Sequence, residues 1–195
     1  MARRPDEKRK EQLLQDLMEL MLSEGLGAFR VGELAARMKC SRSTLYKLAP
    51  SKDDLMRLLF ARFVDEALNA CEDAARAHDS AAAKIMAYVE VLRVHQDRGS
   101  LAFWREVRDL DLTRGVLDVG VARGYRTIQM YMDEGIATGE FRADANTEFL
   151  SYLVWLCARA ARDPEVLERM GLSPGQAIEE LGRFVVYGME PSPGA

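Results

Sequence analysis

Histidine, cysteine and proline are all scarce in this chain of 195 residues. Its two histidines and three widely spaced cysteines, Cys40, Cys71 and Cys157, provide neither a set of metal ligands nor a disulfide framework. A glycine-rich phosphate loop and a nucleophile motif are also missing, so the sequence supports no enzymatic mechanism, and we predict no metal or cofactor. Unpaired cysteines suit a reducing cytoplasm.

Long apolar runs and strand-like alternation are missing as well. The most apolar stretch, Phe149 to Ala158, is too short to span a bilayer, and the basic N-terminus lacks the apolar segment of a signal peptide. We therefore expect a cytoplasmic protein that does not enter a membrane. Only 6 prolines interrupt a sequence that is 48% hydrophobic, which predicts an all-α fold.

Apolar residues at helical spacing, together with capping signals, divide the chain into about nine helices. The predicted helices cover residues 6–23, 31–38, 42–48, 51–76, 80–96, 101–108, 112–138, 144 or 146 to 162, and 173–185, and residues 164–170 are expected to form one further short turn. The helix from residue 51 leads from a small N-terminal bundle into the rest of the chain, so we interpret it as a connector.

The stretch from Arg30 to Leu55 predicts two short helices joined by a tight turn. Leu34, Ala35 and Met38 form the apolar face of the first helix, and Ser41 is suited to cap the second. The second helix exposes cations, hydroxyls and one phenol, the groups that contact base edges and phosphates of DNA, at Arg42, Ser43, Thr44, Tyr46 and Lys47. The alternative is a structural helix pair with an ordinary polar face, which explains the joint spacing less well.

Positive charge is concentrated at the same end of the chain. Residues 1–60 contain 12 Lys or Arg and 9 Asp or Glu, whereas residues 61–195 contain 15 and 22, for a net charge of −4. This asymmetry favours a small basic part that contacts DNA and an acidic body. Ordinary solvated surfaces also produce imbalances of this size.

The first 60 residues resemble the DNA-binding region of the tetracycline-repressor-like (TetR) family of bacterial transcription regulators. The resemblance rests on Gly25, Val31, Glu33-Leu34-Ala35, Ser41, Thr44-Leu45-Tyr46, Pro50-Ser51-Lys52 and Leu55, and the phrase from Gly135 to Asn146 resembles a helix link of that family. It implies a three-helix helix-turn-helix DNA-binding domain over residues 1–50. Residues 51–195 would then form a helical domain for effector binding and dimerisation.

The resemblance also implies roles for single residues. Arg42, Ser43 and Lys47 fall where the family reaches base edges or nearby phosphates, and Thr44, Tyr46 and Lys52 fall where it contacts the DNA backbone. The chain departs from the family at four further positions. Arg30 replaces a hydroxyl cap and can supply a cation but no cap, Lys39 replaces the turn glycine, and Leu48 and Ala49 replace aromatic residues.

For the body, the resemblance implies a homodimer in which the last two long helices of each subunit form a four-helix interface. The stretch from Phe149 to Ala158 is apolar nearly all round, so it is either a buried core helix or a dimer face. The family analogy favours the dimer face. The predicted interface residues are Phe149, Tyr152, Leu153, Leu156, Ile178, Leu181, Gly182 and Val185.

The family also implies an effector pocket, and the body contains aromatic, sulfur-containing and polar side chains that could line one for a small apolar or aromatic ligand. For any single one of them, however, plain core is the favoured interpretation. These candidates are Met86, Tyr88, His95, Phe103, Trp104, Arg108, Tyr125, Tyr131 and Trp155.

Together these features predict a transcriptional regulator, a ligand-responsive repressor that binds a palindromic operator in double-stranded DNA as a homodimer. The alternative is a regulatory or interaction protein that keeps the fold but has weak or no specific DNA binding.

Overall fold

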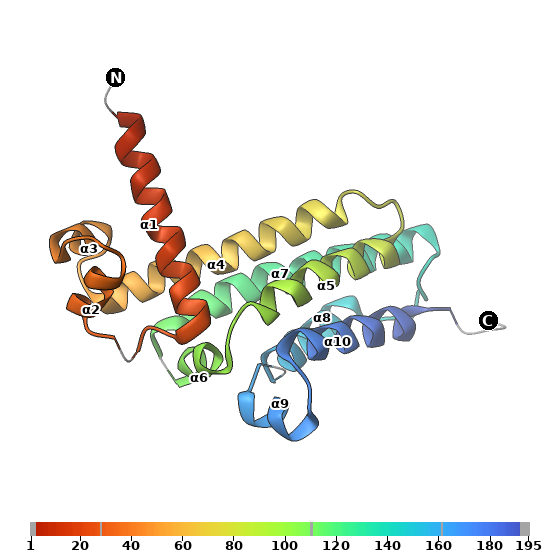
Figure 1. Ribbon diagram of the computed structural model, residues 1–195. Coiled ribbons are helices and arrows are strands. Elements are labelled where there is room, and N and C mark those ends of the chain that lie inside the picture. Colours follow the sequence, from red (N-terminus) through yellow and green to blue (C-terminus); the bar gives the residue numbers. More distant parts are fainter. Residues whose placement is uncertain (1–2, 28, 110, 161, 192–195) are drawn as a thin grey trace. The chain divides into compact units, whose positions relative to one another are not determined.

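The computed structural model describes residues 3–27, 29–109, 111–160 and 162–191, and this part of the chain forms ten helices and no strand (Figure 1). The predicted all-α fold is confirmed, with residues 164–170 forming a helix of their own. The helices are α1 (Arg3–Glu24), α2 (Val31–Arg37), α3 (Arg42–Leu48), α4 (Lys52–Ala75), α5 (Ala81–Asp97), α6 (Leu101–Asp109), α7 (Asp111–Thr138), α8 (Thr147–Ala160), α9 (Pro164–Met170) and α10 (Pro174–Met189). None of these helices is long and apolar enough to cross a membrane.

Short polar side chains start several of these helices. Ser80 accepts a hydrogen bond from the Ala83 N–H at the start of α5, and Ser173 accepts one from the Gln176 N–H at the start of α10. Asn146 accepts a hydrogen bond from the Phe149 N–H in the first turn of α8. Each cap satisfies one of the N–H groups that a helix start leaves without a partner. Local sequence therefore sets these boundaries.

The chain forms two compact units. Unit 1 consists of Met1–Val64 and Gly99–Val116, and unit 2 consists of Asp65–Arg98 and Leu117–Ala195. Unit 1 thus contains α1 to α3, the first part of α4, and α6, whereas α4 and α7 contribute residues to both units. The predicted functional boundary at residue 50 is a different division, and it stays a prediction.

An aromatic cluster forms much of the core of unit 1. Phe60 and Phe63 of α4 meet Phe103 of α6 with ring centroids 6.0 and 5.9 Å apart, and Trp104 meets Phe103 edge-on at 4.8 Å. Phe103 and Trp104 are at most 2% exposed. Burial of such large rings stabilises the unit, and the edge-on geometry adds a favourable electrostatic contact. This cluster secures α6 within unit 1.

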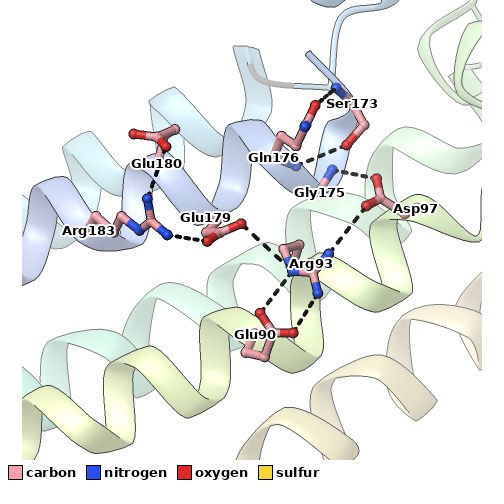
Figure 2. A network of polar contacts seen from close by, with 9 residues as sticks. All are labelled: Glu90, Arg93, Asp97, Ser173, Gly175, Gln176, Glu179, Glu180 and Arg183. Carbon is pink, nitrogen blue, oxygen red and sulfur yellow. Dashed lines mark hydrogen bonds and ion pairs between the residues drawn. The ribbon is translucent and has the colours of Figure 1, made fainter.

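In unit 2, α10 packs closely on α5. A Cβ atom at Gly182 would lie 2.7 Å from the Val89 side chain, so only glycine permits the observed approach. A polar network reinforces the contact (Figure 2): the Asp97 carboxylate accepts a hydrogen bond of 2.8 Å from the Gly175 N–H, and the Arg93 guanidinium of α5 lies 3.8 Å from the Glu179 carboxylate of α10. Together these contacts determine which face of α10 points inward.

Candidate nucleic-acid interface

The helix pair predicted from Arg30 to Leu55 is present as α2 and α3. Ser41 has an extended backbone, and its Oγ accepts a hydrogen bond of 3.1 Å from the Thr44 N–H, which confirms the predicted cap of α3. At the start of α2, the Glu33 carboxylate accepts a hydrogen bond of 2.7 Å from the Arg30 N–H. A carboxylate three residues into the helix thus satisfies the N–H group at this position.

The turn between the two helices forms without glycine. Lys39 adopts the left-handed conformation with φ of 49°, and among the described residues it is the only one other than glycine with a positive φ. The Lys39 and Cys40 N–H groups donate hydrogen bonds to the Ala36 and Ala35 carbonyls at 3.1 and 2.9 Å. These bonds hold a conformation that costs a side chain about 1 kcal/mol or more. The replacement of the family glycine therefore leaves the turn intact.

One face of α3 is polar and open to solvent. Arg42, Ser43, Tyr46 and Lys47 are exposed, and Tyr46 keeps 52% of its surface accessible. Thr44 is half-buried, because its hydroxyl lies 2.8 Å from the Ser41 hydroxyl within the cap. The predicted DNA contacts of α3 are therefore on one accessible side, with Thr44 at its edge.

The opposite side of α3 faces the core of unit 1. Leu45 and Ala49 are buried, and Leu48 is half-buried. Ala49 stands where the resemblance would expect an aromatic residue, and it is only 6% exposed, so the small side chain packs within unit 1. The departure at this position is consequently a packing feature of this chain.

Arg42 and Lys47 carry the two cations of α3, and in the part of the chain that the structure describes neither is paired with a carboxylate. The Arg42 guanidinium lies against the first turn of α2, where a Cβ atom at Gly32 would be 2.6 Å from Nη2. Gly32 thus leaves room for this side chain. An unpaired guanidinium and an unpaired ammonium on one exposed face can bind phosphates or guanine edges.

Lys52 makes a contact that the sequence did not predict. Its Nζ donates a hydrogen bond of 2.7 Å to the Gly27 carbonyl in the loop between α1 and α2. An ammonium has three donors, so this bond leaves donors for a phosphate. The DNA contact of Lys52 stays a prediction, as does that of Arg30, whose side chain is exposed.

Glu106 of α6 binds backbone N–H groups of the same loop. Its two carboxylate oxygens accept hydrogen bonds of 2.9 Å from the Leu26 and Gly27 N–H groups. A Cβ atom at Gly25 or Gly27 would lie 2.5 or 2.6 Å from the carboxylate, and Gly25 also has φ of 73°. No sequence pattern pointed to Glu106, because 79 or 80 residues separate it from the amides that it binds. The loop that leads into α2 is thus clamped by α6 and α4.

Apolar side chains of α8 and α10 remain exposed in unit 2. Phe149, Tyr152, Leu153 and Leu156 of the predicted interface are 38% to 57% exposed. On α10, however, Ile178, Gly182 and Val185 are buried and Leu181 is half-buried, so the predicted face of this helix points into unit 2. The exposed apolar residues of α10 are Phe184 and Tyr187, at 75% and 67%, and the sequence analysis missed both.

The predicted pocket residues do not form one group. Phe103, Trp104 and Arg108 belong to unit 1, the first two as part of its aromatic core, whereas Met86, Tyr88, His95, Tyr125, Tyr131 and Trp155 belong to unit 2. Within unit 2, Tyr88 and Tyr131 are buried. An open pocket of about 510 Å³ lies between α4, α5 and α7, with Tyr131 and Lys84 in its lining.

Burial shifts the pKa values of two side chains of unit 2, His95 and Cys71. Burial, with the charge of Arg98 nearby, lowers the pKa of His95, which favours the neutral imidazole. Burial also raises the pKa of the Cys71 thiol to about 12, so this cysteine is unreactive at neutral pH. Among the described residues, no three His, Cys, Asp or Glu side chains come together as a metal site.

Comparisons with known proteins identify the fold. No family model matches the sequence, and no curated protein matches it. A putative transcriptional regulator from Saccharomonospora viridis, solved in complex with choline, superposes with a TM-score of 0.76 over 95% of this chain and 99% of its own, at 20% identity. A TetR transcriptional regulator from Chloroflexus aurantiacus superposes with a TM-score of 0.73 over 97% and 100%, at 17% identity. The regulator FadR from Bacillus subtilis, in complex with stearoyl-CoA, superposes with a TM-score of 0.69 over 92% of this chain and 99% of its own, at 16% identity.

Proposed function

We propose that this chain, which has the fold of the TetR-family transcriptional regulators, is a DNA-binding regulator that represses transcription as a ligand-responsive homodimer. The observation that carries the proposal is the exposed face of α3, where Arg42 and Lys47 lie beside Ser43 and Tyr46 with no carboxylate of the described residues to neutralise them. Such a face offers charge to phosphates and directional donors to base edges.

The contacts around α3 favour sequence-specific recognition of DNA over non-specific binding. Ser41 caps the helix, Leu45 anchors it in the core, and the loop before α2 is held by Glu106 and Lys52. A reading helix must present its side chains in fixed register to discriminate between sequences. This rigidity argues against the alternative that the chain keeps the fold without specific DNA binding.

A second copy of the chain is the proposed occupant of the apolar face of α8 and α10. This face combines Phe149 and Tyr152 with Phe184 and Tyr187, all at least half exposed, and exposed aromatic groups of this number mark an interaction surface. In a two-fold dimer the same face of both copies meets, and the two α3 helices would enter successive major grooves about 34 Å apart. The operator would accordingly be a palindrome.

A small molecule bound to unit 2 is the proposed signal. The regulator from S. viridis was solved with choline and FadR from B. subtilis with stearoyl-CoA, which supports a ligand in this fold without indicating its chemistry here. Helix α4 contributes residues to both units. A ligand that favours one conformation of unit 2 would therefore change, through α4, the spacing of the two α3 helices in the dimer. The size of that effect is limited by the ligand's differential affinity for the two conformations.

The test compares Arg42→Ala and Lys47→Ala with Arg76→Ala, an exposed arginine of unit 2 that pairs with Asp73. DNA affinity of the purified dimers is measured over a range of salt concentrations. We expect each α3 variant to lose specific affinity, by about tenfold or more for a base contact, and to lower the salt slope by about one for a phosphate contact. Arg76→Ala should bind as the wild type does. If both α3 variants also bind as the wild type, α3 is not the reading helix.

A further inference from the structure

The open pocket of unit 2 between α4, α5 and α7 has a covered floor and an exposed rim. Its floor includes the buried or half-buried side chains of Glu72 of α4, Lys84 of α5 and Tyr131 of α7. Its rim includes the exposed residues His78 and Asp79, which lie between α4 and α5. The volume of about 510 Å³ lies in the range of about 300–1,000 Å³ that is typical of pockets for small ligands. The pocket is therefore large enough to hold a small metabolite.

The Tyr131 hydroxyl opens into this pocket. Tyr131 is 5% exposed, and its hydroxyl has no hydrogen-bond partner among the described residues. In the described part of the chain, the Tyr88 hydroxyl is the one buried side-chain oxygen that is both shut off from solvent and without a partner. The accessible part of Tyr131 therefore includes its hydroxyl, and the pocket is the space that reaches it. Burial raises the pKa of this hydroxyl, so it is protonated at neutral pH and can donate a hydrogen bond to a ligand.

The charged groups of the floor are paired. The Lys84 Nζ lies 2.5 Å from the Glu134 carboxylate and 6.0 Å from the centroid of the Tyr131 ring. The Glu72 carboxylate accepts two hydrogen bonds of 2.8 Å from the Arg123 guanidinium. An ammonium has three donors, so Lys84 keeps donors for a ligand beside the Tyr131 ring. The floor thus offers donors to an anionic group without an excess of positive charge.

An unpaired carboxylate lies at the rim. Arg76 pairs with Asp73 at 2.6 Å, whereas the Asp79 carboxylate has no hydrogen-bond or ion-pair partner among the described residues. Met130, which is 55% exposed, adds an apolar surface to the lining. An exposed carboxylate attracts a cationic group. The rim therefore favours a positive charge, together with an apolar side chain.

We propose that this pocket binds a small α-amino acid as a zwitterion, whose carboxylate accepts hydrogen bonds from the Tyr131 hydroxyl and the Lys84 ammonium and whose ammonium pairs with Asp79. The side chain of the amino acid would contact Met130. The proposal rests on the proposed function, since this amino acid would be the ligand to which the regulator responds. Hydrogen bonds to charged groups are roughly twice as strong as those between neutral groups, so these contacts select for both charged ends of the ligand.

Ligands with a single charge fit the lining less well. The described lining residues include three carboxylates and two cations, at Glu72, Asp79 and Glu134 and at Arg76 and Lys84. A ligand with only a negative charge would meet this acidic excess and leave Asp79 unpaired. A ligand with only a positive charge would lie beside Lys84 and leave the Tyr131 donor unused. A zwitterion complements both the donors of the floor and the carboxylate of the rim.

The first experiment screens the standard L-amino acids against the purified full-length protein at constant pH and ionic strength. The melting temperature reports binding, because a ligand that binds only the folded state raises it. For the amino acid with the largest effect, two analogues follow: the amine that lacks its carboxylate and the acid that lacks its ammonium. We expect the amino acid to bind at least several-fold more tightly than either analogue, since each analogue loses one charged contact.

The second experiment tests the two ends of the ligand separately. Tyr131→Phe removes only the hydroxyl and should weaken amino-acid binding by about tenfold, because a hydrogen bond to a charged group is lost. Asp79→Asn keeps the shape of the side chain and removes its charge, and we expect a loss of about two- to fivefold, because an exposed ion pair is weaker. Asp144→Asn is the matched control: this exposed aspartate of unit 2 pairs with Arg142 outside the pocket, so its replacement should leave binding unchanged.

Three results would overturn the proposal. One is a wild-type protein that no amino acid stabilises. Another is an amine or acid analogue that binds as tightly as the amino acid itself. The third is amino-acid binding that stays unchanged in Tyr131→Phe or in Asp79→Asn. If Tyr131→Phe does not fold, Asp79→Asn at the exposed rim decides.

DNA binding measured on the same samples without amino acid separates this claim from the proposed function. Intact DNA binding with no amino-acid response refutes the ligand alone. An intact amino-acid response without specific DNA binding refutes the regulator alone.

Discussion

Unit 1 and unit 2 differ in how far each satisfies its own side chains. In unit 1, the Ser41 hydroxyl, the Glu106 carboxylate and the Lys52 ammonium all bind backbone groups of the same unit. In unit 2, the Tyr88 hydroxyl is buried without a partner in the described residues, and Phe184 is 75% exposed. This difference agrees with the proposal that unit 2, rather than unit 1, contacts a second subunit.

Charge shows the same contrast. The cations of α3 in unit 1 have no carboxylate partners in the described chain. In unit 2, Arg93 and Arg183 bind carboxylates within their own unit (Figure 2), and Arg123 binds the Glu72 carboxylate. Unpaired cations on an exposed surface attract a polyanion, and paired ones mainly stabilise the fold. The unpaired cations of α3 therefore support the proposal that unit 1 binds DNA.

The largest effect is expected from a charge introduced into the apolar face of α8 and α10 in unit 2. Phe184→Glu places a charge in the proposed dimer interface, so we expect the dimer dissociation constant to rise by about a hundredfold or more. Analytical ultracentrifugation measures the change. Val119→Glu is the matched control, because Val119 on α7 is also 75% exposed. Equal effects of the two variants, or no effect of either, would mean that α8 and α10 are not the interface.

The second prediction tests whether the Glu106 carboxylate holds the loop before α2 in unit 1. Glu106→Ala removes two hydrogen bonds to the loop before α2, each worth about 1.5–3 kcal/mol when the acceptor is charged. We expect faster hydrogen exchange at the Leu26 and Gly27 amides and DNA binding weakened by about tenfold or more. The dimer should stay intact.

Asp109→Ala is the control for Glu106→Ala. Asp109 lies on the same helix, but its carboxylate binds the neighbouring Arg108 side chain at the exposed surface. Exchange at Leu26 and Gly27 should therefore match that of the wild type. A Glu106→Ala variant with wild-type exchange at these amides would show that the loop is held by other contacts.

The smallest effect concerns the cap of α3. Ser41→Ala leaves the Thr44 N–H without its acceptor and should lower the free energy of unfolding by about 1 kcal/mol. Urea unfolding measures the loss. Ser43→Ala changes the same kind of side chain at an exposed position that caps no N–H group, and it should cost less. Equal losses would show that the Ser41 cap does not stabilise unit 1.

The sequence predicted features whose causes lie within a few residues of one another. The caps at Ser41 and Ser173, and the helix pair around Leu34 and Leu45, depend on spacings of three or four residues, which the sequence displays directly. Even the turn at Lys39, where a glycine was expected, follows from local backbone hydrogen bonds. Such signals can be recognised in the sequence without knowledge of the tertiary fold.

The remaining features depend on contacts between distant residues. Helix α10 has apolar residues on more than one side, so periodicity could not tell that Ile178 and Gly182 pack inward while Phe184 and Tyr187 stay exposed. The Gly182 position is settled by the close approach of Val89 on α5. The aromatic character of Phe103 and Trp104 likewise could not show that they belong to the core of unit 1.

The most direct test of the central claim selects binding sites from a pool of random double-stranded DNA with the purified full-length protein. We expect enrichment of a palindrome whose half-sites lie one helical turn apart, about 34 Å, or a multiple of it. Arg42→Ala should fail to enrich this sequence. Enrichment of no common sequence by the wild-type protein, with binding that depends on salt alone, would contradict the claim that α3 reads an operator.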